Sequence, residues 1–293
     1  MSDTLAGLLR KRGSARDLQS VVRSMKAMAA SSIGQYEKSV SALTDYYHTV
    51  ELGLSVCLRE SESIPEIKKT DSDRIGAVVF GSDQGLVGQF NEELVDFSLK
   101  MLATLPGTPS IWAVGERVHA RLTDDGLAVP GLFPVPNSIK GITPLVGRIL
   151  VESENIKGKN ELSALYLFYN RPQADVVYTP VSQRLLPLDE IWRRDLIDFP
   201  WPTTQLPEVI GNSMVTLRAL IREYLFVSLF RACAESLASE NASRLAAMQR
   251  AEKNIEELLD DLDGRFNRLR QSSIDEELFD VISGFEALSK LPS

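Results

Sequence analysis

Few residues in this 293-residue sequence have the types and spacing that chemistry requires, and one glycine-rich stretch is the first candidate. GSDQGLVG, at Gly81–Gly88, follows an apolar run and precedes a segment of helical character. In that setting the N–H groups at a helix N-terminus can hold a phosphate. The stretch matches neither the GxxxxGK[ST] phosphate loop nor the full GxGxxG dinucleotide turn. We therefore expect Gly81–Gly88 to be a structural turn and predict no bound cofactor.

The residues that commonly bind metals or act as nucleophiles are few and far apart. His48 and His119 are the only histidines, and neither lies in HxxxH or HExxH spacing. Cys57 and Cys233 form no CxxC pair, a usage typical of a reducing compartment without a disulfide framework. We expect no metal site and no histidine-based triad. These residues do not indicate an enzyme.

The charge pattern narrows the classes of partner. The formal net charge of −8 and a pI near 5.0 argue against a nucleic-acid-binding protein, which normally carries a basic face. The acidic run at 256–263 is interpreted as a solvated helix face, because calcium loops need a glycine-interrupted spacing. No stretch is apolar and long enough to span a bilayer, and the N-terminus lacks the apolar core of a secretory signal. We expect any membrane association to run through partners.

Proline divides the chain into three parts. Of the 14 prolines, 13 lie between Pro65 and Pro207, and the other is Pro292. Because proline in a helix interior costs about 3 kcal/mol, the proline-free ends can form long helices. We predict an N-terminal helix within 1–60, a central α/β domain at 74–190 and a C-terminal helix within 206–290.

The two terminal segments both show helical periodicity. In the first, Val21, Met25, Met28 and Ser32 fall at helical spacing. In the second, residues in alternating steps of four and three form a heptad seam: Asn241, Leu245, Met248, Glu252, Ile255, Leu259, Leu262, Phe266, Leu269 and Ser273. Helices this long, roughly 80 and 120 Å, would exceed a compact domain. We predict that they pair as an antiparallel coiled coil; two ordinary helical bundles flanking the body are the alternative.

The middle of the chain alternates between short apolar runs and helical segments. Strands are expected at 75–80, 110–115, 161–170 and 175–188, and helices at 91–101, 116–123 and 145–152. Such alternation favours parallel pairing of the first strands, whereas the last two are expected to form an antiparallel hairpin. The predicted fold class is α/β, with a central Rossmann-like domain between the coiled-coil helices.

Three sequence blocks resemble the γ subunit of F-type ATP synthases. The most specific is Ser228–Leu288, with its motifs SENASRLAAM, FNRLRQSSI and EELFDVISG. VVRSMKAMAAS (Val21–Ser31) and VVFGSDQGLVGQFN (Val78–Asn91) are similar to the N-terminal helix and central glycine motifs of that family. The central motif departs from the family at Gln84, Val87 and Gln89, where arginine, cysteine and glycine are typical. These departures suggest a divergent branch, with the alternative ion-translocating ATPases as a candidate.

This resemblance implies a non-catalytic rotor shaft that transmits torque between a membrane ion-driven ring and nucleotide sites on β subunits. Its partners would be three α and three β subunits, the ε subunit and the membrane rotor ring, at the cytoplasmic face of the inner or thylakoid membrane. ATP synthesis or hydrolysis, coupled to proton or other ion transport, would take place on the complex.

The resemblance also implies which residues contact the β subunits. They are Met25, Arg244, Arg270, Gln271 and Glu277. Arg270 and Gln271 match an arginine–glutamine pair that bonds a β-subunit loop, and Glu277 would share the polar cluster around Arg270.

Two other functions remain as alternatives to the rotor. One is a nucleotide-binding α/β protein with helical arms, which an intact phosphate loop would favour. The other is a coiled-coil scaffold, which would associate with itself through its long helices.

Overall fold

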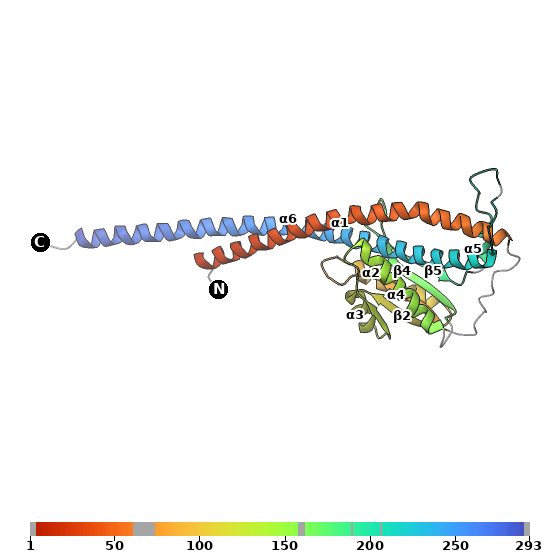
Figure 1. Ribbon diagram of the computed structural model, residues 1–293. Coiled ribbons are helices and arrows are strands. Elements are labelled where there is room, and N and C mark those ends of the chain that lie inside the picture. The colour runs from red at the N-terminus through yellow and green to blue at the C-terminus, as the bar shows by residue number, and fades with distance from the viewer. Residues whose placement is uncertain (1–3, 61–73, 158–161, 189, 206, 290–293) are drawn as a thin grey trace. The chain divides into compact units, whose positions relative to one another are not determined.

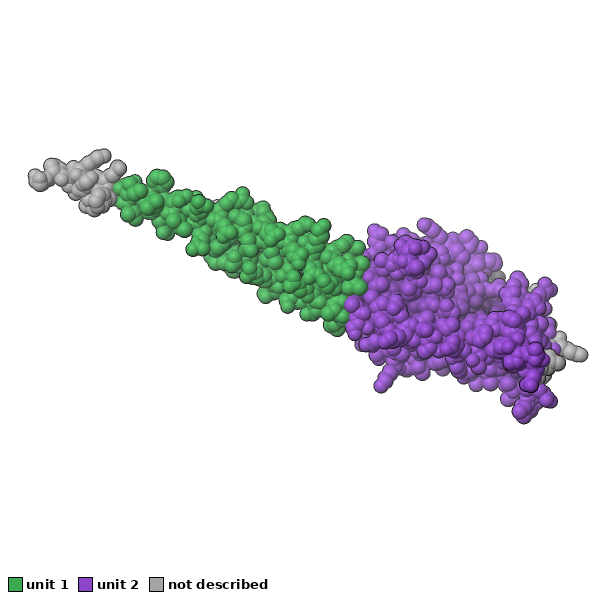
Figure 2. All heavy atoms as spheres, turned by 90° about the horizontal axis from the view of Figure 1, so that it is seen from above, with its two compact units in different colours: residues 1–28, 245–293 green, residues 29–244 purple. Residues whose placement is uncertain are grey.

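The computed structural model describes residues 4–60, 74–157, 162–188, 190–205 and 207–289. The chain forms two compact units, coloured separately in Figure 2. Unit 1 combines residues 1–28 with 245–293, and unit 2 comprises residues 29–244. The boundaries between the units therefore fall inside the two long helices, not at their ends.

Those helices are α1 (Leu5–Glu60) and α6 (Ser213–Ser289), each of which contributes to both units. Both lie inside the predicted ranges 1–60 and 206–290, and α6 begins several residues after the start of its range. That helix begins later because Asn212 is its N-terminal cap. The Asn212 Oδ1 atom accepts the N–H groups of Met214 and Val215, at 3.0 and 3.2 Å.

Unit 1 is an antiparallel pair of helices, as the heptad pattern predicts. Leu8 and Ala15, near the start of α1, pack with Leu262 of α6. Val22, farther along α1, packs with Met248 and Ile255, which come earlier in α6. Residues later in α1 therefore contact residues earlier in α6, as in an antiparallel pair.

The predicted seam of α6 is confirmed within unit 1. Its buried and half-buried apolar members are Leu245, Met248, Ile255, Leu259, Leu262, Phe266 and Leu269. The seam position between Met248 and Ile255 is taken by a carboxylate, Glu252, whose side chain is only 14% exposed.

The expected apolar positions of α1 are partly wrong, although Met25 packs in the seam. Val21 and Met28 are 54% and 71% exposed, whereas the adjoining Val22 and Ala29 are buried. The buried stripe has a period of seven, and Leu43 is its one half-buried member: Leu8, Ala15, Val22, Ala29, Tyr36, Leu43, Val50 and Cys57. The seam positions between its first members are the polar Arg12, Gln19 and Lys26, which hid it from a search for apolar spacing.

Unit 2 contains a five-stranded sheet in the order β3-β2-β1-β4-β5. Strands β1 (Arg74–Phe80), β2 (Thr108–Val114), β3 (Gly131–Phe133) and β4 (Ala164–Arg171) run parallel, and β5 (Thr179–Leu186) pairs antiparallel with β4. Ala77 lies opposite Ile111 on one side and Tyr166 on the other. The parallel strands and the final hairpin are confirmed.

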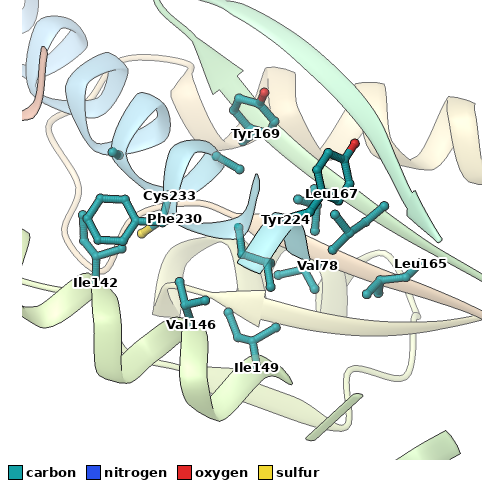
Figure 3. Close-up of a cluster of buried hydrophobic side chains, with 14 of the residues drawn as sticks. Val78, Ile142, Val146, Ile149, Leu165, Leu167, Tyr169, Tyr224, Phe230 and Cys233 are labelled. Atoms are coloured by element: carbon teal, nitrogen blue, oxygen red, sulfur yellow. The ribbon is translucent and has the colours of Figure 1, made fainter. Parts of the chain in front are cut away.

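Helices cover both faces of this sheet (Figure 1). On one face, α2 (Phe90–Thr104) and α3 (Glu116–Asp124) pack against Ala77 and Val79. On the other, α1, α4 (Ile139–Lys157) and α6 pack against Val78, Leu165 and Leu167. Figure 3 shows Ile142, Val146 and Ile149 of α4 beside these strands, with Phe230 and Cys233 of α6. The sheet is thus the middle of three layers.

Three features of unit 2 differ from the sequence-based expectation. Strand β3 and helix α5 (Glu190–Ile197) were not predicted, and α4 is much longer than the expected 145–152. Gly141 and Pro144 lie within α4 and weaken its helical pattern. Tertiary packing overrides this local preference, since the side chains of Ile142, Leu145, Val146 and Ile149 are buried.

The seam of unit 1 gives a first testable prediction, which compares two nearby leucines of α6. Leu262 is 6% exposed and Leu258 is 48% exposed. We expect Leu262→Ala to lower the local free energy of unfolding by about 2–5 kcal/mol, because it leaves a cavity in the seam. Leu258→Ala should change it by less than about 0.5 kcal/mol. Native-state hydrogen exchange of α6 amides in unit 1 measures both; equal effects would contradict the seam assignment.

Candidate functional site

The glycine-rich stretch at 81–88 uses its own polar groups to hold its shape. The N–H of Gly81 donates to the carbonyl of Val114 at 2.8 Å, which ties the loop to β2. The N–H of Ser82 donates to Asn91 Oδ1 at 3.0 Å, and Asn91 Nδ2 donates back to Ser82 Oγ at 2.9 Å. Ser82 and Asn91 are buried, so this reciprocal pair fixes the loop against the start of α2.

The loop also forms hydrogen bonds with the N-terminus of α3. Asp83 accepts the N–H of Glu116, in the first turn of α3, at 3.0 Å and the N–H of Val135 at 2.9 Å. The Ser82 carbonyl accepts the N–H of Arg117 at 2.9 Å. Gly115 permits this approach, because a Cβ there would lie 2.7 Å from the Ser82 carbonyl oxygen. The Glu116 and Arg117 amides at the start of α3 are therefore bonded to oxygens of the loop.

Three serines of α6 bind backbone carbonyls of β1, β4 and the glycine-rich loop. Ser236 Oγ donates to the carbonyl of Phe80 at 2.9 Å, and Ser239 Oγ donates to that of Asn170 at 3.0 Å. Ser243 Oγ donates to the carbonyl of Val87 at 2.5 Å. Steps of three and four residues place these hydroxyls on one face of the helix. Ser236 and the two serines of the SENAS motif, Ser239 and Ser243, thus position α6 on the sheet and on the loop.

Arg244, one of the predicted partner-binding residues, is bonded within unit 2. Its Nη2 lies 2.7 Å from Glu240 Oε1, and the two side chains are 13% and 7% exposed. Burial raises the pKa of Glu240, and the charge of Arg244 opposes that rise. The Nε of Arg244 is buried without a hydrogen-bond partner among the described residues. Most of this side chain therefore faces the protein.

Met25, a second predicted residue, lies half-buried on α1 in unit 1. It packs with Val22, Met248 and Ile255. Methionine adapts readily to such irregular apolar contacts. The position therefore has a packing role in addition to any contact with a partner.

A charged network adjoining Met25 was missed by sequence reasoning. Glu252 of α6 accepts hydrogen bonds from Lys26 Nζ at 2.5 Å and Arg23 Nε at 2.7 Å. Arg23 also lies 3.3 Å from Glu256. The hydrogen bonds from Lys26 and then Arg23 hold the pKa of Glu252 below its ordinary value. No signal in a single helix identifies such a network, since its members come from both helices.

Arg270, Gln271 and Glu277 are exposed on the C-terminal part of α6. They form no hydrogen bond or ion pair within the described part of the chain. Leu269 beside them packs in the seam with Leu8 and Leu262, and the adjoining pair faces outward. Glu277 lies seven residues beyond Arg270, roughly 10 Å along the helix axis. The two share a helix face but are not in contact.

The five predicted residues are divided between the two units. Met25 and the C-terminal residues belong to unit 1, and Arg244 belongs to unit 2. Within the described ranges, no group of three or more His, Cys, Asp or Glu side chains could hold a metal ion. Nor does any described helix combine the length and apolarity needed to cross a membrane.

Comparison with known proteins gives one consistent family. A family model described as ATP synthase matches residues 4–288. The ATP synthase gamma chain of Glaesserella parasuis serovar 5 (strain SH0165) is 28% identical over 284 residues, covering 95% of this chain and 97% of the relative. That of Syntrophus aciditrophicus (strain SB) is 27% identical over 303 residues, covering 98% and 99%.

Two solved structures share the fold. A chain of the Euglena gracilis mitochondrial ATP synthase, OSCP/F1/c-ring in rotational state 3, has a TM-score of 0.63 at 17% identity, covering 99% of this chain and 97% of that one. A chain of the Tetrahymena thermophila mitochondrial ATP synthase central stalk/c-ring has a TM-score of 0.58 at 19% identity, covering 79% and 99%.

The Glu252 network generates a prediction about acid. Because the pKa of Glu252 is lowered on folding, the network stabilises unit 1 at neutral pH, and this contribution is lost as the pH falls below about 4.5. Glu252→Gln should therefore be less stable at pH 7 and lose less stability on acidification. Hydrogen exchange of α6 amides across this pH range measures the effect. Glu257→Gln is the matched control, since that exposed carboxylate has only a 4.0 Å contact with Lys253; an equal change in both variants would contradict the role of Glu252.

Proposed function

The chain belongs to the ATP synthase gamma-chain family, and we propose that its paired long helices transmit torque from a membrane ion-driven ring to nucleotide sites on β subunits. It is a non-catalytic subunit, the central rotor shaft of the complex, and ATP is made or hydrolysed on its β subunits. The observation that carries this function is the antiparallel seam, in which α1 and α6 bury their apolar stripes against each other.

The structure of the seam explains how such a shaft could work. A helix pair held by apolar packing and by the Lys26–Glu252 bridge resists bending better than either helix alone. The two helices carry different side chains, so the shaft presents a different surface on each side. Each of the three β subunits around it would meet a different surface at any moment. Rotation then shifts each site among conformations of different nucleotide affinity, a population shift driven by differential contacts.

We infer that Arg270 and Gln271 contact a polar loop of a β subunit. Both are exposed, and Leu269 holds the adjoining seam, so they can bind a partner without disturbing the helix pair. A guanidinium offers five N–H donors in a fixed fork, and the glutamine amide adds donors and an acceptor. Charge-assisted bonds of this kind suit a contact that forms in one rotary position and breaks in the next. Glu277, on the same helix face as Arg270, completes the proposed polar surface.

Met25 and Arg244 are proposed as β-subunit contacts of a different kind. Each is partly covered by its own chain, by the seam in one case and by Glu240 in the other. The buried Nε of Arg244 is a donor that a partner's oxygen could satisfy after a small rearrangement.

The shaft is part of a membrane-associated complex with α, β and ε subunits and the rotor ring. We propose that it lies at the cytoplasmic face of the inner or thylakoid membrane. We also propose a divergent branch of the family for this chain. The unusual Gln84, Val87 and Gln89 of its central motif support that placement, as do identities of only 27–28% with two curated relatives.

Reconstitution with α and β subunits tests the function directly. The rotor function predicts a complex of three α subunits, three β subunits and one copy of this chain. That complex should hydrolyse ATP, and this chain alone should not. Native mass spectrometry and a hydrolysis assay measure both properties. A coiled-coil scaffold predicts self-association instead, and a nucleotide-binding enzyme predicts hydrolysis by the isolated chain. Either result would contradict the rotor function.

The Arg270–Gln271 contact is tested in the same reconstituted complex. Replacing both by alanine should remove about 1.5–3 kcal/mol per charged hydrogen bond in the rotary position where the loop is bound. We expect normal assembly and several-fold slower hydrolysis of ATP. The double variant Asn267→Ala, Arg268→Ala is the matched control, because both residues are exposed on the same helix. Equal rates in wild type and in the Arg270→Ala, Gln271→Ala complex would show that the loop is bound elsewhere.

A further inference from the structure

Unit 2 contains a cavity of about 450 Å³ that neither the seam nor the glycine-rich loop explains. It lies between α1, the end of β4 and α6. Its lining comes from residues far apart in the sequence: Glu37, Val40, Ser41, Thr44, Arg171, Pro172, Arg231, Glu235 and Ala238. None of these residues is assigned to the contacts with β subunits proposed above.

A buried carboxylate holds two arginines at this cavity. Glu235 is only 4% exposed. Its Oε2 accepts a hydrogen bond from Arg171 Nε at 2.9 Å, and its Oε1 accepts one from Arg231 Nε at 2.7 Å. Both guanidinium groups therefore bind Glu235 through Nε and not through their terminal nitrogens.

Aromatic rings fix the same two guanidinium groups. The Arg171 guanidinium carbon lies 5.5 Å from the centre of the Tyr169 ring, and Arg171 Nη2 donates to the Tyr169 hydroxyl at 2.6 Å. The Arg231 guanidinium carbon lies 6.0 Å from the centre of the Tyr47 ring. Within the described chain, the two Nη groups of Arg231 and Nη1 of Arg171 have no hydrogen-bond acceptor. The two guanidinium groups are thus held in place, but three of their terminal nitrogens remain free, among the described residues, to donate hydrogen bonds to a ligand.

Two guanidinium groups at this wall of the cavity share one buried carboxylate, Glu235. Glu51 of α1 is also close enough to Arg231 to interact with its charge. Glu37, on the exposed surface of α1, is the other acidic lining residue, and water screens its charge. An anion between the arginines would receive charge-assisted hydrogen bonds from both.

We propose that this cavity binds a small phosphate-bearing molecule, whose oxyanion is held by Arg171 and Arg231. The volume falls within the range of small-molecule sites and exceeds the space that one phosphate fills. Val40, Pro172 and Ala238 give the cavity apolar walls for the rest of the ligand. Glu235 is a positioning residue, which orients both guanidinium groups without contacting the ligand. The site is independent of the torque-transmitting role of the chain.

Calorimetric titration of the full chain tests the proposal, with inorganic pyrophosphate and adenosine monophosphate as separate probes at constant ionic strength. We expect saturable binding of at least one probe, weakened at least tenfold by Arg231→Gln. That variant keeps the ion pair between Arg171 and Glu235 and so should remain folded, as circular dichroism would verify. Arg148→Gln is the matched control, since that arginine lies over the Phe133 ring and does not line the cavity.

The two probes distinguish the source of the phosphate. Binding of pyrophosphate alone indicates an inorganic ligand, and tighter binding of the nucleotide indicates that the apolar walls contribute. Absence of saturable binding for both probes would overturn the proposal, leaving the charge cluster as a link between β4 and α6. Binding that is unchanged in both Arg231→Gln and Arg171→Gln would overturn it as well, because the anion would then lie elsewhere.

Discussion

The structure depends on the mutual burial of two apolar stripes that neither long helix can cover alone. An isolated helix with the stripe of α1 would leave Leu8, Val22 and their heptad equivalents in water. Pairing with α6 removes this surface from solvent in unit 1, and in unit 2 the same two helices also bury one face of the sheet. The chain can therefore begin and end in long helices only because its middle returns it antiparallel to its start.

Polar residues within the seam make this pairing specific. Apolar stripes of similar residues tolerate sliding by a heptad, whereas a charge in the seam must meet its partner. Lys26 meets Glu252, and Arg12 lies 3.0 Å from Asp263. A shift of one heptad would separate both pairs and leave Glu252, whose side chain is only 14% exposed, without Lys26. The same residues that interrupt the apolar pattern of α1 thus select its register.

Sequence reasoning recovered features that local pattern determines and missed those that depend on distant neighbours. The heptad spacing of α6 and the strands at 75–80 and 110–115 are strong local signals, and the structure confirms them. The α1 stripe was partly misplaced because Arg12 and Lys26 become seam residues only opposite an acidic partner. Strand β3 has three residues, too few for a pattern, and α4 forms despite Pro144 because its apolar side is buried. For the candidate site, exposure of Arg270 and Gln271 followed from the seam, but the commitment of Arg244 to Glu240 required the three-dimensional structure.

The serine hydroxyls of α6 in unit 2 have a mechanical consequence. From a single helix face, Ser236 and Ser239 donate to carbonyls of β1 and β4, and Ser243 donates to a carbonyl of the glycine-rich loop. Since successive residues of an α-helix are about 100° apart, turning α6 about its own axis by one residue would break all three bonds together. These bonds therefore fix the rotation of α6 about its own axis relative to the sheet. A twist applied to α6 in this region turns the rest of unit 2 together with the helix.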